Sequence, residues 1–297
     1  MNRLTHLLVA ALALTCVAGA IAQTTEGYYR QPAISNDSIV FVTEGDLWRT
    51  SLAGGYAQRL TTNLAAESNP AISPDGKWLA FTARYEGPAE VYVMPMGGGA
   101  PTRLTFDGDI ATVQGWTPDG KVLFSSPRYS GKPDARLYTI DPANRISAPI
   151  PLHQAAEGCY LGMSLIFGRQ TPISDNVKRY QGGQAQKIWR FDTGKEAVSL
   201  TADYAGTSRQ PMCGNGRIYF ISDRDGTFNI WSMSGEGRDV KQHTRHSDFD
   251  IRGASISADG KRIAYQRGAD IYMLDTASNA DLKLALSLQS DFEHTRT

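Results

Sequence analysis

The feature that most constrains this chain is a unit that repeats along it. The unit contains a turn of the Asp-Gly-Lys type and closes with a Leu-Thr pair. The turn stands at residues 75–77, 119–121 and 259–261, and as Asn-Gly-Arg at 215–217. The closing pair stands at residues 60–61, 104–105 and 200–201, with His243-Thr244 in the same place. Such spacing predicts one structural unit for every forty to fifty residues.

Each unit has the pattern of four short strands. An Asp-Gly pair allows the positive φ angles of a tight hairpin, so it joins the first strand to the second. The fourth strand ends at the Leu-Thr pair, and four antiparallel strands per unit are typical of a propeller blade. The chain is therefore predicted to be all-β, a six-bladed β-propeller of four-stranded antiparallel blades. The six units are residues 30–61, 68–105, 113–152, 159–201, 209–244 and 251–287.

The first and last units both have enough strands for a complete blade. We therefore expect a ring that is not closed by one terminus completing the blade of the other. Closure would then depend on face-to-face packing between blades one and six.

The first residues differ in composition from the rest of the chain. Arg3 supplies a positive charge, residues 7–21 are nearly all apolar or small, and Ala20-Ile21-Ala22 fits a cleavage site. This pattern predicts a signal peptide over residues 1–22, because its apolar stretch is short for a membrane anchor. We expect a periplasmic or secreted protein with no other membrane contact. The propeller would span residues 23–288, and residues 289–297 would begin a connection to a further region.

Charge and cysteine content narrow the partners and the covalent chemistry. Thirty basic and thirty acidic residues cancel, so nucleic acid is not an expected partner. Beyond the signal peptide only Cys159 and Cys213 remain, in a compartment that permits disulfides. They lie near the start of adjacent repeats and could pair, or they could be two buried apolar side chains.

No motif for a catalytic or cofactor site occurs in the chain. It lacks the nucleophile elbow, the zinc-binding His-Glu-x-x-His pattern and a phosphate-binding glycine loop. We therefore predict no catalytic residue and no cofactor. His243, His246, Asp248 and Asp250 have side chains that could ligate a metal. We predict none there, since a polar connection between two blades explains them.

Three tryptophans occupy the third strand of their units. Trp48, Trp189 and Trp231 could form a stacking surface for sugars or bases. Packing between blades is the favoured interpretation, because large aromatic side chains fill the wedge between neighbouring sheets.

Several motifs resemble those of a known family. They are Phe-Val-Thr-Glu-Gly-Asp-Leu-Trp at 41–48, Gly-Trp-Thr-Pro-Asp-Gly at 115–120, Lys-Arg-Tyr-Gln-Gly-Gly at 178–183 and His-Thr-Arg-His-Ser-Asp-Phe-Asp at 243–250. Together they resemble the amino-terminal six-bladed propeller of tricorn-type serine peptidases over nearly the whole mature chain. More broadly, the repeats look like the WD-like repeats of TolB-type proteins.

The resemblance implies a role in proteolysis without chemistry of its own. In that family a second propeller, a PDZ domain and a peptidase core follow, and the family's catalytic residues match no position in this chain. The expected function is a non-catalytic module that binds or gates peptides or products in its central channel. Expected partners are peptides or proteins, including downstream peptidase domains. The alternative is a free-standing periplasmic protein-binding scaffold of TolB type.

Aligning the repeats on their first strands yields one candidate binding site. Arg30, Arg209 and Arg252 precede the residues that open the first strands of blades one, five and six. First strands line the channel of a propeller, so these arginines would face one mouth. Their guanidinium groups suit a carboxylate, which makes the carboxyl end of a peptide the expected ligand. The alternative is that each pairs with an acidic neighbour or is simply solvated.

Overall fold

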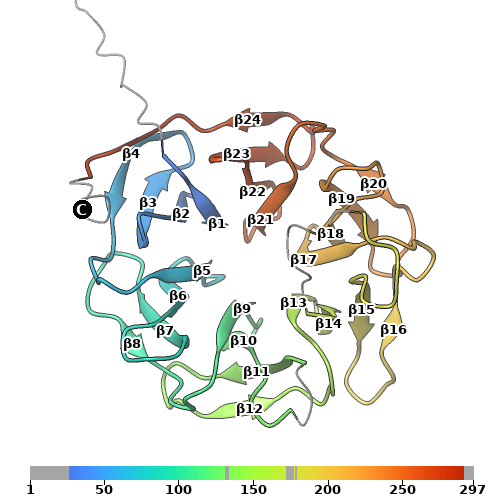
Figure 1. Cartoon of the computed structure of the whole chain (residues 1–297), viewed down its shortest axis with the longest axis horizontal. Helices are drawn as coiled ribbons and strands as arrows, with labels where there is room; N and C mark the ends of the chain where they lie inside the picture. Colours follow the sequence, from blue (N-terminus) through green and yellow to red (C-terminus); the bar gives the residue numbers. More distant parts are fainter. Residues whose placement is uncertain (1–26, 131–133, 172–176, 178, 291–297) are drawn as a thin grey trace, which may run out of the picture.

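The computed structural model shows a ring of six blades around a central channel (Figure 1). It describes residues 27–130, 134–171, 177 and 179–290. Each blade is an antiparallel sheet whose first strand lies innermost. The predicted all-β, six-bladed fold is confirmed. The predicted signal peptide and most of the predicted connection at 289–297 lie outside the described residues.

Blades one to three take up the first half of the ring. Blade one contains β1 (Arg30–Ile34), β2 (Ser38–Thr43), β3 (Asp46–Ser51) and β4 (Gly54–Arg59). Blade two contains β5 (Glu67–Ile72), β6 (Trp78–Ala83), β7 (Glu90–Pro95) and β8 (Thr102–Arg103). Blade three contains β9 (Thr112–Trp116), β10 (Val122–Ser126), β11 (Arg136–Ile140) and β12 (Ser147–Pro149).

Blades four to six complete the ring. Blade four contains β13 (Glu157–Leu161), β14 (Ser164–Gly168), β15 (Ile188–Phe191) and β16 (Val198–Ser199). Blade five contains β17 (Ser208–Gly214), β18 (Arg217–Ser222), β19 (Asn229–Ser234) and β20 (Lys241–Gln242). Blade six contains β21 (Ile251–Ile256), β22 (Arg262–Arg267), β23 (Asp270–Asp275) and β24 (Asp281–Lys283). A last strand, β25 (Leu286–Leu288), follows.

Every blade carries an aromatic pair at the same position of its second and third strands. The pairs are Phe41 with Trp48, Phe81 with Tyr92, Phe124 with Tyr138, Phe167 with Trp189, Phe220 with Trp231, and Tyr265 with Tyr272. In each pair the second-strand ring is buried. All three tryptophans named from the sequence belong to this set, so their arrangement supports the packing interpretation.

The apolar core is divided among the seams between blades. Each of the six main clusters in the described residues joins two neighbouring blades. The aromatic pair of a blade lies in the cluster shared with the preceding blade, as Phe81 of blade two lies with Leu47 of blade one. Packing between blades therefore supplies the core, as expected for sheets arranged as wedges.

The closing Leu-Thr pair of the repeat has a structural role. The Thr61, Thr105, Thr201 and Thr244 hydroxyls accept hydrogen bonds from the amides of Leu47, Val91, Ile188 and Ile230, at 2.9 to 3.0 Å. All four threonines are buried. The hydroxyl thus satisfies a third-strand amide at the point where the short fourth strand ends, which accounts for the repetition of threonine at this position.

The expected mode of ring closure is wrong in one respect. Blade one has its own four strands, as expected, but β25 adds a fifth by pairing in parallel with β4. The predicted sixth unit, residues 251–287, therefore extends into a strand that belongs to blade one. Gly54 permits this pairing, because a Cβ there would lie 2.6 Å from the Ala285 carbonyl oxygen. Three residues without a turn motif carry no signal in the repeat pattern, so the strand was not predicted.

The two cysteines are joined. Cys159 on β13 and Cys213 on β17 form a disulfide with Cα atoms 5.8 Å apart. The bond links the first strands of blades four and five, beside the channel. Of the two possibilities left open by the sequence, the structure has the disulfide.

Candidate functional site

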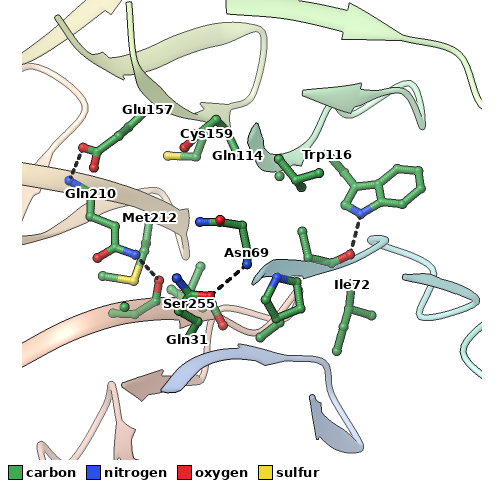
Figure 2. Close-up of a pocket in the computed structure, with 18 of the residues that line it drawn as sticks. Gln31, Asn69, Ile72, Gln114, Trp116, Glu157, Cys159, Gln210, Met212 and Ser255 are labelled. Atoms are coloured by element: carbon green, nitrogen blue, oxygen red, sulfur yellow. Dashed lines mark hydrogen bonds between the residues drawn. The ribbon is translucent and has the colours of Figure 1, made fainter. Parts of the chain in front are cut away.

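A central channel runs between the six blades in the described part of the structure. It has a volume of about 1040 Å³ and is lined by the first strands of all six blades. The strands alternate in direction within a blade, so each fourth strand ends where the next first strand begins. The first strands of all six blades therefore begin at the same end of the channel. Figure 2 shows side chains from several blades converging on this space.

Five first strands contain a bulge at the same height. That of β9 lies between Val113 and Gly115. In β1, β5, β17 and β21 the regular pairing with the second strand is interrupted after Arg30, Ser68, Arg209 and Arg252. These four residues are thus structurally equivalent. Their partners lie one residue beyond the buried aromatic of the second strand, as Val42 follows Phe41. Applying that rule to blades three and four places Thr112 and Glu157 at the same height.

We call these six equivalent positions the arginine tier, and the nearby end of the channel the arginine mouth. The tier consists of Arg30, Ser68, Thr112, Glu157, Arg209 and Arg252. The three predicted residues all line the channel and come from the adjacent blades five, six and one. The structure thus brings the predicted arginines to one side of one mouth.

The arginines differ in their surroundings. The Arg30 guanidinium carbon lies 5.4 Å from the Tyr28 ring centroid, and its Nε is buried without a hydrogen-bond partner among the described residues. The Arg209 guanidinium carbon lies 4.4 Å from the Phe228 ring centroid. Both contacts place a cation against an aromatic face, which helps to position the guanidinium group.

Glu157 is a member of the tier that the sequence alignment missed. Burial raises the pKa of its carboxyl group, while the Gln210 amide and the nearby Arg209 charge oppose this change. The Gln210 N–H donates to Glu157 Oε2 at 2.8 Å. Arg209 therefore has an acidic neighbour, which was one of the alternatives to carboxylate binding in the sequence analysis. The predicted start of unit four at residue 159 excluded Glu157, because blade four has no Pro in its first strand to mark the alignment.

A second set of channel-lining residues, which we call the carboxamide tier, follows on the first strands. Gln31, Asn69 and Gln210 come one residue after the arginine tier, and Gln114 comes two residues after Thr112, within the irregularity of β9. Gln31, Asn69 and Gln210 have positive φ angles of 48°, 50° and 51° at the bulges. In blade six the equivalent residue is Gly253, with φ 43°. A carboxamide residue followed by Pro in blades one, two and five was the sequence signal that could have identified this tier.

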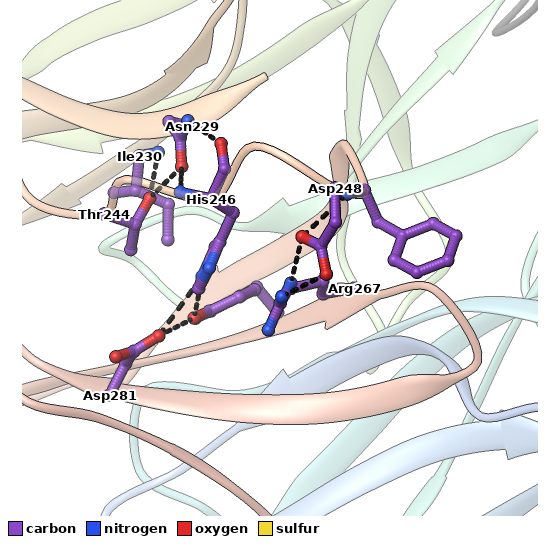
Figure 3. A network of polar contacts seen from close by, with 9 residues as sticks. Asn229, Ile230, Thr244, His246, Asp248, Arg267 and Asp281 are labelled. Carbon is purple, nitrogen blue, oxygen red and sulfur yellow. Dashed lines mark hydrogen bonds and ion pairs between the residues drawn. The ribbon is translucent and has the colours of Figure 1, made fainter. Parts of the chain in front are cut away.

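The histidine and aspartate cluster of the blade five to six connection is divided among separate contacts. His246 Nε2 lies 2.9 Å from the Tyr265 hydroxyl and 3.1 Å from Asp281 Oδ2, and burial lowers the His246 pKa (Figure 3). Asp248 instead forms an ion pair with Arg267. No group of three or more potential metal ligands gathers anywhere in the described residues. These contacts account for the cluster as a polar seam between the two blades.

Comparison with known proteins agrees with the ring and its repeats. Residues 26–280 match the family model described as the tricorn protease N-terminal beta propeller domain. A putative tricorn protease homolog 2 of Streptomyces coelicolor is 33% identical over 262 residues, covering 84% of this chain and 22% of the relative. A tricorn protease homolog of Saccharolobus solfataricus is 28% identical over 274 residues, covering 90% and 25%.

Structural comparison gives the same result. The crystal structure of the tricorn protease superposes with a TM-score of 0.81 at 26% identity, over 90% of this chain and 27% of that chain. A TolB protein of Desulfosudis oleivorans matches only 24% of this chain, at 32% identity over 76 residues. The TolB-type alternative is therefore the weaker one.

The chain spans about a quarter of the length of the tricorn relatives it matches. The described part of the chain contains no helix with the length and apolar character needed to cross a membrane. Nearly all of the described ring falls within the family match. The protein belongs to the family of tricorn protease N-terminal β-propeller domains.

Proposed function

We propose that this propeller is the non-catalytic module of an exported tricorn-like peptidase, and that its channel binds or gates peptides by their carboxyl ends at the arginine mouth. The single observation that carries the proposal is the placement of three arginines at equivalent positions of adjacent blades, beside a channel of about 1040 Å³. A peptidase region, in the same chain or in a separate one, is the proposed partner.

The electrostatics of the channel favour an anionic ligand end. A guanidinium group presents several N–H donors in a plane that matches a carboxylate. A narrow space with protein walls also concentrates the field of such charges. Glu157 is the one acidic member of the tier, and burial raises the pKa of its carboxyl group. Arg30 and Arg252 lie in blades one and six, away from Glu157 in blade four.

Export forms part of this proposal because of the amino-terminal pattern. The apolar stretch and the Ala-Ile-Ala site predict cleavage after Ala22 and a mature chain that begins near Gln23. A disulfide beside the channel fits an oxidising compartment. Amino-terminal sequencing of the protein recovered from the periplasm or medium would test this part; recovery of only the uncleaved chain from the cytoplasm would contradict it.

The binding proposal is tested with short peptides of one sequence whose carboxyl terminus is either free or amidated. We expect the free form to bind at least tenfold more tightly by calorimetry, because only it offers a carboxylate to the arginines. In the combined variant Arg30→Ala, Arg209→Ala and Arg252→Ala, this preference should disappear.

A matched control separates local contacts from net charge. The exposed residues Arg145, Arg238 and Arg245 lie outside the channel lining, and their replacement by Ala changes the net charge equally. This control should retain the preference for the free carboxyl end. Equal binding of both peptide forms by the native protein, or an unchanged preference in the channel variant, would show the proposal to be wrong.

A further inference from the structure

The carboxamide tier suggests how the channel handles the rest of a peptide. Its four side chains are neutral and come from blades one, two, three and five. A primary carboxamide offers an acceptor oxygen and two N–H donors, the same groups that a peptide main chain requires. A ring of such groups can therefore bind a main chain without regard to the charge of the side chains that it carries.

Internal contacts hold the glutamines by one end. Gln31 Oε1 accepts a hydrogen bond from the backbone N–H of Asn69 at 2.9 Å. Gln114 Nε2 donates to Ser125 Oγ at 3.0 Å, and Gln210 Nε2 donates to the Ala254 carbonyl at 3.2 Å. The Asn69 side chain makes no hydrogen bond within the described residues, and Figure 2 shows it among the other lining groups. The tier is thus oriented by the ring while part of its hydrogen-bonding capacity is left unused.

The backbone at this tier is held in an unfavourable conformation. Gln31, Asn69 and Gln210 have φ near 50°, although a proline follows each of them. Non-glycine residues with positive φ cost on the order of 1 to 3 kcal/mol and concentrate at functional sites. Glycine would avoid this cost, as it does at Gly253, but it would remove the carboxamide. The presence of carboxamides at three strained positions therefore points to a use for the side chains.

The two tiers are neighbours in the chain. Arg30 precedes Gln31, and Arg209 precedes Gln210, so in blades one and five the two tiers are consecutive residues. An extended peptide advances by about 3.3 to 3.6 Å for each residue. A peptide whose carboxylate lies at the arginines would therefore place its last peptide bonds against the carboxamides.

We infer that the carboxamide tier binds the main chain of an extended peptide of any side-chain sequence, whose carboxyl end points toward the arginine mouth. This inference rests on the proposed function, since the arginines supply the direction. The ligand class is an unfolded peptide segment with free main-chain N–H and C=O groups. A helical segment is excluded, because its main-chain groups are already paired.

The experiment compares acetylated tetra-alanine that has a free carboxyl end with the same peptide N-methylated at its last two peptide bonds. N-methylation removes the N–H donors but keeps the carboxylate. We expect the native protein to bind the methylated peptide at least tenfold more weakly. Replacing the alanines by Ser, Lys or Glu should change the affinity less than threefold, because the tier is neutral.

The carboxamide variant combines Asn69→Gly, which tolerates the positive φ, with Gln114→Met, which keeps the shape of the side chain. It should bind the unmethylated peptide three- to thirtyfold more weakly and lose most of the discrimination against methylation. Asn279→Gly is the matched control, since Asn279 has φ 60° on an exposed turn between β23 and β24. Thermal melting of all variants monitors folding.

The outcomes separate the two proposals. Failure of the native protein to bind the free peptide contradicts the proposed function and, with it, this inference. If the arginine variant loses binding but methylation and the carboxamide variant have no effect, only this inference is wrong. If methylation weakens binding equally in the native protein and the carboxamide variant, main-chain contacts exist elsewhere and the assignment to this tier is overturned.

Discussion

The seam between blades four and five and the seam between blades six and one are stabilised in different ways. At the first, Cys159 and Cys213, which are 54 residues apart in sequence, form a covalent bond between β13 and β17. At the second, the two blades are neighbours in space but come from opposite ends of the ring's sequence, and they are joined by noncovalent contacts. These include the Tyr29 amide bonded to the Ala269 carbonyl at 2.9 Å, the Ile34 amide bonded to Ser255 Oγ at 2.8 Å, and β25 on β4.

The difference shows that chain connectivity determines what a seam requires. Blades four and five are consecutive, so the loop between them already keeps them close. The disulfide then acts mainly by limiting the unfolded chain. Blades six and one have no such tether, and residues 284–288 supply one by crossing the seam to β4, with Leu284 and Leu286 buried. Both devices restrain a ring that could otherwise open.

The largest expected effect comes from weakening the closing strand. Leu286→Ala should lower the free energy of unfolding by about 3 to 5 kcal/mol, because it leaves a cavity in the core shared by blades six and one. Leu282→Ala removes the same atoms from an exposed position on β24 and should have little effect. Chemical denaturation of both variants measures the difference, and equal stabilities would mean that β25 does not hold the ring closed.

Removal of the disulfide should have a somewhat smaller effect. Replacing both Cys159 and Cys213 by Ala is expected to lower the free energy of unfolding by about 2 to 4 kcal/mol, since the unfolded chain regains the freedom of the closed loop. Reductant should destabilise the native protein to a similar degree and leave the double variant unchanged. If reductant does not change the free energy of unfolding of the native protein, the disulfide does not stabilise the seam between blades four and five.

The seam between blades one and two has neither device and provides a reference. It contains Glu67, whose pKa is raised from 4.5 to about 7, chiefly by burial and also by the nearby Asp46. The Tyr85 and Thr61 hydroxyls donate to its carboxyl oxygens at 2.5 and 2.9 Å. Because the folded state binds this proton more tightly than the unfolded state, its contribution is fully present below pH 4.5 and is lost as the pH rises through 7.

In the native protein the free energy of unfolding should therefore fall by an amount on the order of 2 kcal/mol between pH 4.5 and 8. The Glu67→Gln variant should not show this fall. Unfolding by denaturant across this range measures it. Glu86→Gln, at an exposed carboxyl of the same blade, should keep the native pH dependence. The assignment of this pH dependence to Glu67 would be wrong if the stability of the native protein rose with pH in this window. It would also be wrong if the Gln variant had the same pH dependence as the native protein.

The sequence predicts the parts of this molecule that repeat. Asp-Gly turns and Leu-Thr pairs together define six blades, because each has a local physical role, and every unit carries at least one of the two. The arginines were found by the same alignment. Glu157 was missed because blade four lacks the proline marker, and β25 because a three-residue parallel strand depends on a partner more than 200 residues away. The disulfide remained open because the spacing of two cysteines does not show whether they meet.

The closing strand also has a consequence for the order in which the ring is made. The two rings of each aromatic pair, such as Phe41 and Trp48, lie in one hairpin and can meet as soon as that hairpin has been synthesised. Five seams join consecutive blades, and each can form once the second of its two blades has been synthesised. The partner of β4, however, lies at residues 286–288, so the β4 edge of blade one stays uncovered until the sixth blade has been synthesised. If the chain is exported unfolded, that edge is first protected when all six blades have crossed the membrane.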